Sequence, residues 1–127
     1  MVNFELSEDQ EMLAELARNF ADDELIPNAE KWDRMGLFPE EAIRNARELG
    51  LLNCTIPEEY GGMGLSFLDE VIINEELERG DPGFATITGV TMLACHPIIY
   101  AGTEEQKVEF LGRVCDGEIS AYCVTEP

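Results

Sequence analysis

The spacing of apolar residues predicts a helix in the first part of this chain of 127 residues. Ser7 and Gln10 have the spacing of a capping box, in which each side chain bonds to the other residue's backbone N–H at the start of a helix. Apolar residues then recur every three or four positions, as along one face of a helix: Leu13, Leu16, Ala17, Phe20 and Ala21. Pro27 should end or kink this helix, and a second helical stretch should run on towards Trp32.

Two more helices follow from the same kind of spacing. The first should begin at Pro39, because proline is tolerated in a first helical turn, and it should end before Gly50. A loop containing several glycines then covers residues 51–65. Ser66 is a suitable cap for the next helix, which should reach Gly80.

The segment 84–100 carries almost no charge and is apolar on several sides. This pattern predicts a buried helix that is broken or kinked near Pro97. Thr103 and Gln106 form another capping box, so a further helix should begin there.

The last residues predict a different kind of element. Residues 119–125 combine β-branched and aromatic side chains and lack a helical stripe, which predicts a strand. A single strand leaves its backbone groups unpaired and cannot form a sheet. The predicted fold class is therefore all-α, a bundle of about five helices that ends in one orphan β-strand. This combination is typical of a truncated larger protein, with a helical domain at 1–117 and the first strand of a missing β domain at 118–127.

Charge and cysteine content narrow the range of functions. The formal net charge of −19 at pH 7 disfavours nucleic acid and anionic membranes as partners, because both are negatively charged. No stretch approaches about 18 consecutive apolar residues, so no membrane span is predicted. Four cysteines without a CxxC pair and a single histidine, His96, do not predict a metal site. The cysteines are expected to be reduced, and no leader sequence is visible at the N-terminus, so we expect a cytoplasmic protein.

Four sequence blocks carry a resemblance to a known family. They are PEEYGGMG at 57–64, EEL at 75–77, PIIYAGTEEQK at 97–107 and YCVTEP at 122–127. Each block is short, but together they occur in the family's order and with family-like gaps. The chain therefore resembles the N-terminal region of a medium-chain-like acyl-CoA dehydrogenase over essentially its whole length, and it stops as the flavin-binding segment begins.

The resemblance implies an enzyme with an N-terminal helical domain, a middle β domain and a C-terminal helical bundle. FAD would accept hydride from an acyl-CoA thioester while a glutamate base removes the α proton, as in fatty-acid β-oxidation. The electrons would pass to an electron-transferring flavoprotein, and the full-length protein would be a homo-oligomer. Because the family's glutamate lies beyond this sequence, we predict no catalytic residue here. The chain alone should be inactive and should bind FAD weakly or not at all.

Three residues near the C-terminus match family positions that contact the flavin: Tyr122, Val124 and Thr125. The resemblance implies that Thr125 offers its hydroxyl and backbone N–H to the pyrimidine edge of the flavin. The alternative is that all three are ordinary strand residues that need a partner strand.

Three residues of the uncharged segment match positions that line the far end of the family's fatty-acyl tunnel: Ala85, Gly89 and Leu93. They follow one another at four-residue steps and so share one helix face. Small residues at two of the positions leave room for a medium or longer acyl chain. Glycine within a helix costs about 1 kcal/mol relative to alanine, which suggests that another group approaches closely. The alternative is helix–helix packing without a ligand.

The sequence is compatible with two other functions. In one, the chain is a subunit that completes its site with another chain, and the strand at 119–125 pairs across the interface. In the other, it is a non-catalytic helical module that binds an acyl chain or a protein partner. A large exposed apolar patch would fit both alternatives.

Overall fold

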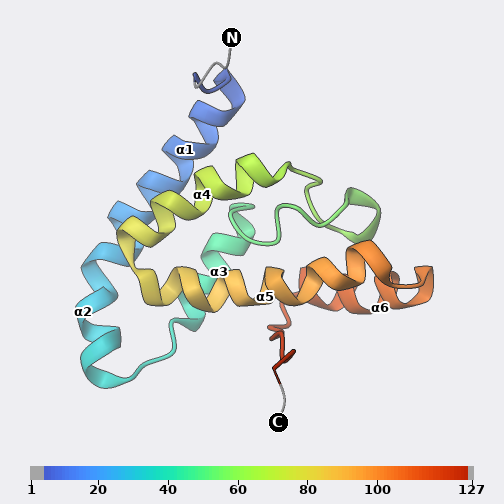
Figure 1. Cartoon of the computed structure of the whole chain (residues 1–127). Coiled ribbons are helices and arrows are strands. Elements are labelled where there is room, and N and C mark those ends of the chain that lie inside the picture. Colours follow the sequence, from blue (N-terminus) through green and yellow to red (C-terminus); the bar gives the residue numbers. More distant parts are fainter. Residues whose placement is uncertain (1–4, 126–127) are drawn as a thin grey trace.

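The computed structural model describes residues 5–125, and its regular secondary structure is helical (Figure 1). The elements are α1 (Glu8–Phe20), the π-helical turn η1 (Ala21–Leu25), α2 (Ile26–Met35), α3 (Glu40–Glu48), the short 3₁₀ turn η2 (Glu58–Tyr60), α4 (Phe67–Gly80), α5 (Pro82–Ala101) and α6 (Glu104–Cys115). Because α1, η1 and α2 follow one another without a break, the described helices form five units. The all-α class and the helix number are confirmed.

The capping boxes expected from the sequence are present. The Ser7 hydroxyl accepts from the Gln10 N–H at 3.2 Å, and the Gln10 side chain accepts from the Ser7 N–H at 3.1 Å. Thr103 and Gln106 make the same reciprocal pair at the start of α6. Local bonding of this kind satisfies N–H groups that have no partner within the helix.

Of the two effects expected of Pro27, an end of the helix does not occur, and the second helical stretch expected towards Trp32 is present as α2. Directly before it, the chain widens into η1, where the Ile26 N–H donates to the Ala21 carbonyl. A π turn shifts the bonding register where a proline ring would crowd the carbonyl of the preceding turn, so the helix continues as α2. Tertiary packing fits this turn closely, since a Cβ at Gly80 would lie 2.9 Å from the Ala21 Cβ and 3.0 Å from the Leu25 Cβ.

The hydrophobic core has two parts, one at each end of α5. The larger part joins α1, η1, α3, α4 and the start of α5, and Phe84 is buried there with its ring centroid 6.0 Å from that of Phe20. The smaller part joins the far half of α5 to α6 and to the loop after α3, around Ile56, Cys95 and Leu111. Figure 1 shows α1 beside α4, with α5 crossing beneath α4 and α6 at its far end.

Helix α5 is less buried than expected, and the break expected as one alternative near Pro97 does not occur. It runs through Pro97 without a break, and it is buried on one side only, because Leu93 and Tyr100 are exposed. By length and composition, α5 is the one helix among residues 5–125 that could cross a membrane, and 33% of that stretch is buried in this fold. Core helices pass the same test, and α5 packs against α4 and α6.

The strand expected at 119–125 is not formed. These residues have no regular secondary structure, and the described residues offer no second strand with which they could pair. Since strands are stabilised by their neighbours, a β-rich sequence stays irregular without one. Glu126 and Pro127 of the YCVTEP block lie outside the described residues.

Candidate functional site around helix α5

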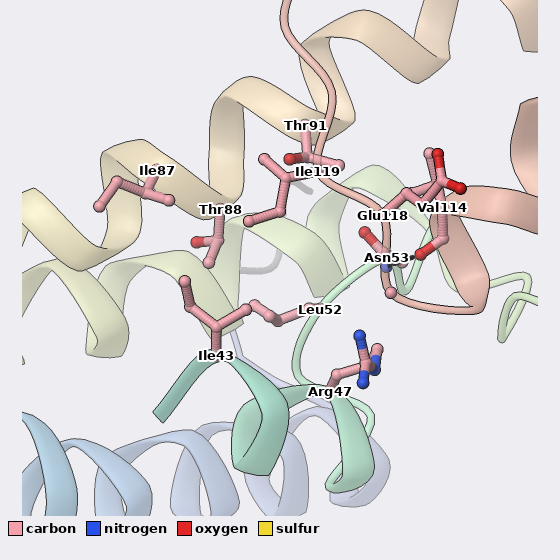
Figure 2. A pocket seen from close by; sticks show the side chains of 11 residues that line it. Ile43, Arg47, Leu52, Asn53, Ile87, Thr88, Thr91, Val114, Glu118 and Ile119 are labelled. Atoms are coloured by element: carbon pink, nitrogen blue, oxygen red, sulfur yellow. Dashed lines mark hydrogen bonds between the residues drawn. The ribbon is translucent and has the colours of Figure 1, made fainter. Parts of the chain in front are cut away.

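The C-terminal segment is attached to the middle of α5. The Thr91 hydroxyl donates to the Ser120 carbonyl, and the Ser120 hydroxyl donates to the Thr91 carbonyl, both at 3.4 Å. Figure 2 shows Ile119 beside Thr91, at a hollow between α3, α5 and the end of α6. The hollow is lined mainly by aliphatic side chains and threonines. The first two residues of the segment therefore have defined positions, and the later ones leave the surface.

A glycine and an arginine lie at the point where the chain leaves α6. Gly117 has a φ of 111°, which favours glycine, and a Cβ on it would overlap the Arg47 guanidinium. The Asn53 amide donates to the Val114 carbonyl at 3.2 Å and so joins the loop after α3 to the last turn of α6. These contacts direct the segment across α5 instead of along α6 (Figure 2).

The three residues predicted to contact flavin lie in the exposed part of this segment. Tyr122 is 43% exposed and Val124 is 66% exposed, and Thr125 is exposed as well. Their side chains are accessible, which fits one edge of a flavin site. A single extended segment cannot enclose a three-ring cofactor, so the remaining contacts would have to come from elsewhere. The assignment of these residues stays a prediction.

The three residues predicted to line an acyl tunnel do not share one environment. Ala85 is buried in the larger core, which fits the packing alternative. Gly89 has no atom within 4 Å of the place where a Cβ would stand, so packing against another described helix does not explain it. Leu93 is 50% exposed. Gly89 and Leu93 thus share the open side of α5, and their role stays a prediction.

The predicted flavin segment and the predicted acyl residues are on different sides of α5. At about 100° per residue, Leu93 lies roughly 200° around the helix from Thr91, where the C-terminal segment is attached. Within residues 5–125, α5 therefore separates the two groups. Sequence reasoning missed Thr91, although a threonine in an uncharged apolar helix is a usable signal for a polar contact.

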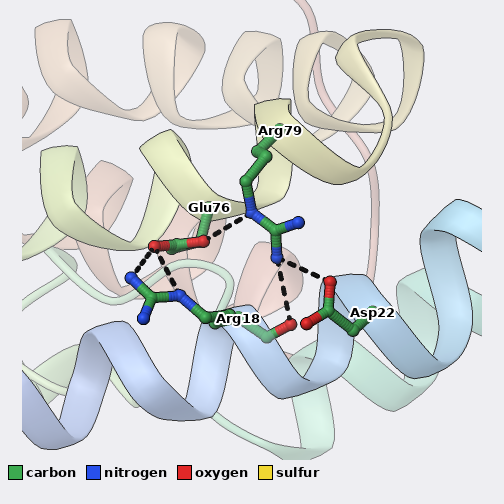
Figure 3. A network of polar contacts seen from close by, with 4 residues as sticks. All are labelled: Arg18, Asp22, Glu76 and Arg79. Carbon is green, nitrogen blue, oxygen red and sulfur yellow. Dashed lines mark hydrogen bonds and ion pairs between the residues drawn. The ribbon is translucent and has the colours of Figure 1, made fainter.

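The strongest electrostatic cluster lies away from α5 (Figure 3). The mostly buried Glu76 carboxylate accepts from the Arg18 Nε at 3.0 Å and from the Arg79 Nε at 2.8 Å, and Arg79 also pairs with Asp22 at 2.8 Å. Hydrogen bonding from Arg18 lowers the pKa of Glu76 against the opposing effect of burial. The four residues tie α1 and η1 to α4, which is a structural role.

Two buried thiols and the tyrosine next to the glycine loop are not activated nucleophiles. Burial raises the pKa of Cys54 to about 12 and that of Cys95 to about 11. A hydrogen bond from the Tyr60 hydroxyl to Glu104, at 2.8 Å, raises the pKa of Tyr60 to about 12. All these groups are protonated at neutral pH. The geometry of the described residues therefore favours binding over covalent chemistry.

Comparison with known proteins identifies the family to which this chain belongs. The family model of the acyl-CoA dehydrogenase N-terminal domain matches residues 7–118. The chain belongs to this family through that domain.

Three relatives show how far the likeness extends. A protein described as probable medium-chain specific acyl-CoA dehydrogenase 2, mitochondrial, from Caenorhabditis briggsae is 42% identical over 99% of this chain and 31% of its own length. The structure of an acyl-CoA dehydrogenase complexed with FAD from Bacillus anthracis matches with a TM-score of 0.89 and 32% identity, over 100% of this chain and 22% of the other. A chain in a structure described as the electron transferring flavoprotein of Acidaminococcus fermentans matches with a TM-score of 0.83 and 35% identity, over 91% of this chain and 31% of the other. The chain thus spans about a third or less of these relatives.

Proposed function

We propose that this chain forms the N-terminal helical domain of a flavin-dependent acyl-CoA dehydrogenase. In the full-length protein, it would help to form the acyl-binding site and one edge of the flavin site. The substrate would be an acyl-CoA thioester, and an electron-transferring flavoprotein would accept the electrons. The observation that carries the proposal is the open, uncharged side of α5 in a chain whose family is defined by residues 7–118.

The acyl role rests on Gly89 and Leu93. An acyl chain needs an apolar surface with free space beside it, and Leu93 offers exposed apolar surface while Gly89 leaves space at its own position. The helical glycine carries a cost in stability with no packing partner among the described residues to explain it. A ligand that fills this space accounts for the cost. Ala85 takes a supporting role, since it fixes α5 to the core from behind.

The flavin role rests on the accessible residues after Ser120. FAD, when bound, supplies the hydride acceptor. Tyr122, Val124 and Thr125 would contact one edge of it from a segment whose start is fixed to α5 by Ser120 and Thr91. The other contacts and the catalytic base would come from outside this chain. We therefore expect the isolated chain to be colourless and inactive. The unpaired state of its four cysteines supports a reducing, cytoplasmic location.

The proposal can be tested in the full-length protein with two matched glycine substitutions. Gly89 and Gly112 both lie in helices, and neither has an atom within 4 Å of the place where a Cβ would stand. Gly89→Leu should lower kcat/KM for longer acyl-CoA thioesters by at least about tenfold relative to the shortest ones, because the added side chain fills the space for the chain end. Gly112→Leu, on α6, should leave this ratio unchanged.

Two results would contradict the proposal. The first is equal loss for all chain lengths with Gly89→Leu, which would make the open side of α5 irrelevant to the acyl group. The second is turnover of an acyl-CoA thioester, or bound flavin absorbance, in the purified chain of 127 residues, which would show that the domain is sufficient alone.

A further inference from the structure

A histidine and a glutamate face each other between the first turns of α4 and the last turns of α5. His96 Nε2 lies 3.9 Å from Glu70 Oε2, and the side chains are 25% and 13% exposed. His96 Nε2 is fully buried and has no hydrogen-bond partner. A buried polar atom without a partner is costly, and the Glu70 carboxylate lies slightly too far away for a hydrogen bond.

Aromatic rings hold the imidazole in place. The Phe67 ring meets it edge-on, with centroids 5.0 Å apart, and the Tyr100 ring lies 6.4 Å away. Phe67 and Glu70 are in the first turn of α4, while Tyr100 is in the last turn of α5. The contact therefore joins two helix ends whose own hydrogen bonding is weakest.

Helix α5 has a built-in weak point at this place. Pro97 has no N–H to donate to the carbonyl of Leu93, and its ring crowds the turn before it. The residue before a proline also disfavours the helical conformation, and that residue is His96. The backbone of α5 therefore lacks one hydrogen bond just before its last turn.

Few other charges compete for the pair among the described residues. On α4, Asp69 is engaged with Ser66 and Gln10. The titratable groups nearby from the other elements are Tyr100 and two buried thiols, Cys95 on α5 and Cys54 in the loop after α3. The charge of Glu70 helps to raise the pKa of both thiols, so they remain neutral. His96 is the partner available to Glu70.

We propose that His96 and Glu70 form a proton-controlled latch between α4 and α5. When His96 is neutral, the contact is loose and the last turn of α5 opens readily. When His96 gains a proton, it pairs with the Glu70 carboxylate across a short, mostly buried gap and holds the turn after Pro97 against α4. Histidine is the side chain suited to such a change between about pH 5 and 8.

The test is amide hydrogen exchange in the chain of 127 residues, measured as protection factors at about pH 5.5 and about pH 8. At the lower pH, Glu70→Gln should reduce the protection of residues 98–101 by about five- to tenfold, and His96→Gln should do the same. The double variant should lose no more than either single one, because both remove one interaction. At the higher pH, Glu70→Gln should match the unmodified chain, while His96→Gln should keep only the loss that comes from its missing contacts with Phe67 and Tyr100.

A matched control separates the latch from a general effect of charge. Glu75→Gln removes the same charge from an exposed position of α4 and should leave the protection of 98–101 unchanged at both pH values. The imidazole nitrogen signals of the single histidine show directly whether both nitrogens carry protons. The proposal is wrong if His96 is doubly protonated at the lower pH and Glu70→Gln has no larger effect than Glu75→Gln. It is also wrong if the effect of Glu70→Gln is the same at both pH values.

Discussion

The half of the molecule built from α1 and α4 differs sharply from the outer side of α5. In the half built from α1 and α4, apolar side chains pack in a shared core and charged side chains pair in the Arg18–Glu76–Arg79–Asp22 network. On the outer side of α5, Leu93 and Tyr100 are apolar or aromatic and exposed. The uncovered side of α5 is the surface that we propose for acyl binding, while the half built from α1 and α4 holds α5 in place through the shared core. Substitutions in the half built from α1 and α4 should therefore lower the free energy of unfolding, whereas substitutions on the outer side of α5 should change it little.

The largest expected difference is between two aromatic residues at opposite ends of α5. Phe84 is 1% exposed in the core, and Tyr100 is 69% exposed on the outer side. Phe84→Ala should lower the free energy of unfolding by about 3–5 kcal/mol, because it leaves a cavity beside Phe20. Tyr100→Ala should change it by less than about 1 kcal/mol. Chemical denaturation of both variants measures this directly, and equal losses would refute the division of α5 into a paired and an open side.

The next effect comes from the carboxylate at the centre of the network. Glu76→Gln should lower the free energy of unfolding by about 2 kcal/mol at neutral pH, because it removes a charge that two guanidinium groups share in a mostly buried place. Glu78→Gln, at an exposed position on another side of α4, is the control and should cost little in the same denaturation measurement.

The contribution of Glu76 to stability should depend on pH. The pKa of Glu76 is lowered in the fold, so its contribution is complete above the ordinary glutamate pKa of about 4.3 and is lost as the pH falls through the lowered value. The difference in unfolding free energy between the unmodified chain and Glu76→Gln should therefore shrink on acidification from neutral pH to about pH 3. A difference that grows on acidification would contradict the ionised state assigned to Glu76.

These contrasts also explain what the sequence could and could not predict. Helix starts such as Ser7 and Thr103 depend on bonds within four residues, so the pattern located them correctly. The π turn before Pro27 packs closely against Gly80, a contact between residues distant in the sequence that no local pattern contains. The prediction of a strand at 119–125 was wrong, because a strand needs a neighbouring strand and the described residues contain none.

The candidate site was predictable to a similar degree. An apolar, uncharged segment indicated α5, but a segment that is apolar on several sides does not indicate which side is covered. Gly89 and Leu93 proved to be open and Ala85 buried, a distinction that depends on how α5 meets the rest of the core. The pairing of Thr91 with Ser120 joins residues 29 apart and follows from the direction in which the chain leaves Gly117.

A smaller effect distinguishes two helical glycines, one at the end of α4 and one within α5. Gly80→Ala should destabilise the chain by about 1–2 kcal/mol, because the new methyl group would press on Ala21 and Leu25 in the π turn. Gly89→Ala should stabilise it by up to about 1 kcal/mol, because alanine is the better helix former and the space around it is open. If α5 is open at Gly89, thermal unfolding should show a lower melting temperature for Gly80→Ala and a higher one for Gly89→Ala. Destabilisation by Gly89→Ala would mean that the space is filled by the chain itself.

The smallest effect tests the attachment of the C-terminal segment. Thr91→Val removes one of two long hydrogen bonds, so global stability should change by no more than about 1 kcal/mol. The local change should be larger: without the Thr91 hydroxyl, residues 120–125 should be cleaved several-fold faster by added protease, because they open without unfolding the helices. Thr86→Val is the matched control, since its hydroxyl bonds to the Pro82 carbonyl within α5 and does not touch the segment. If both variants are cleaved at the same rate, Thr91 does not fix the segment. The predicted flavin residues would then have no defined position relative to α5 in this chain, and only the rest of a full-length protein could order them.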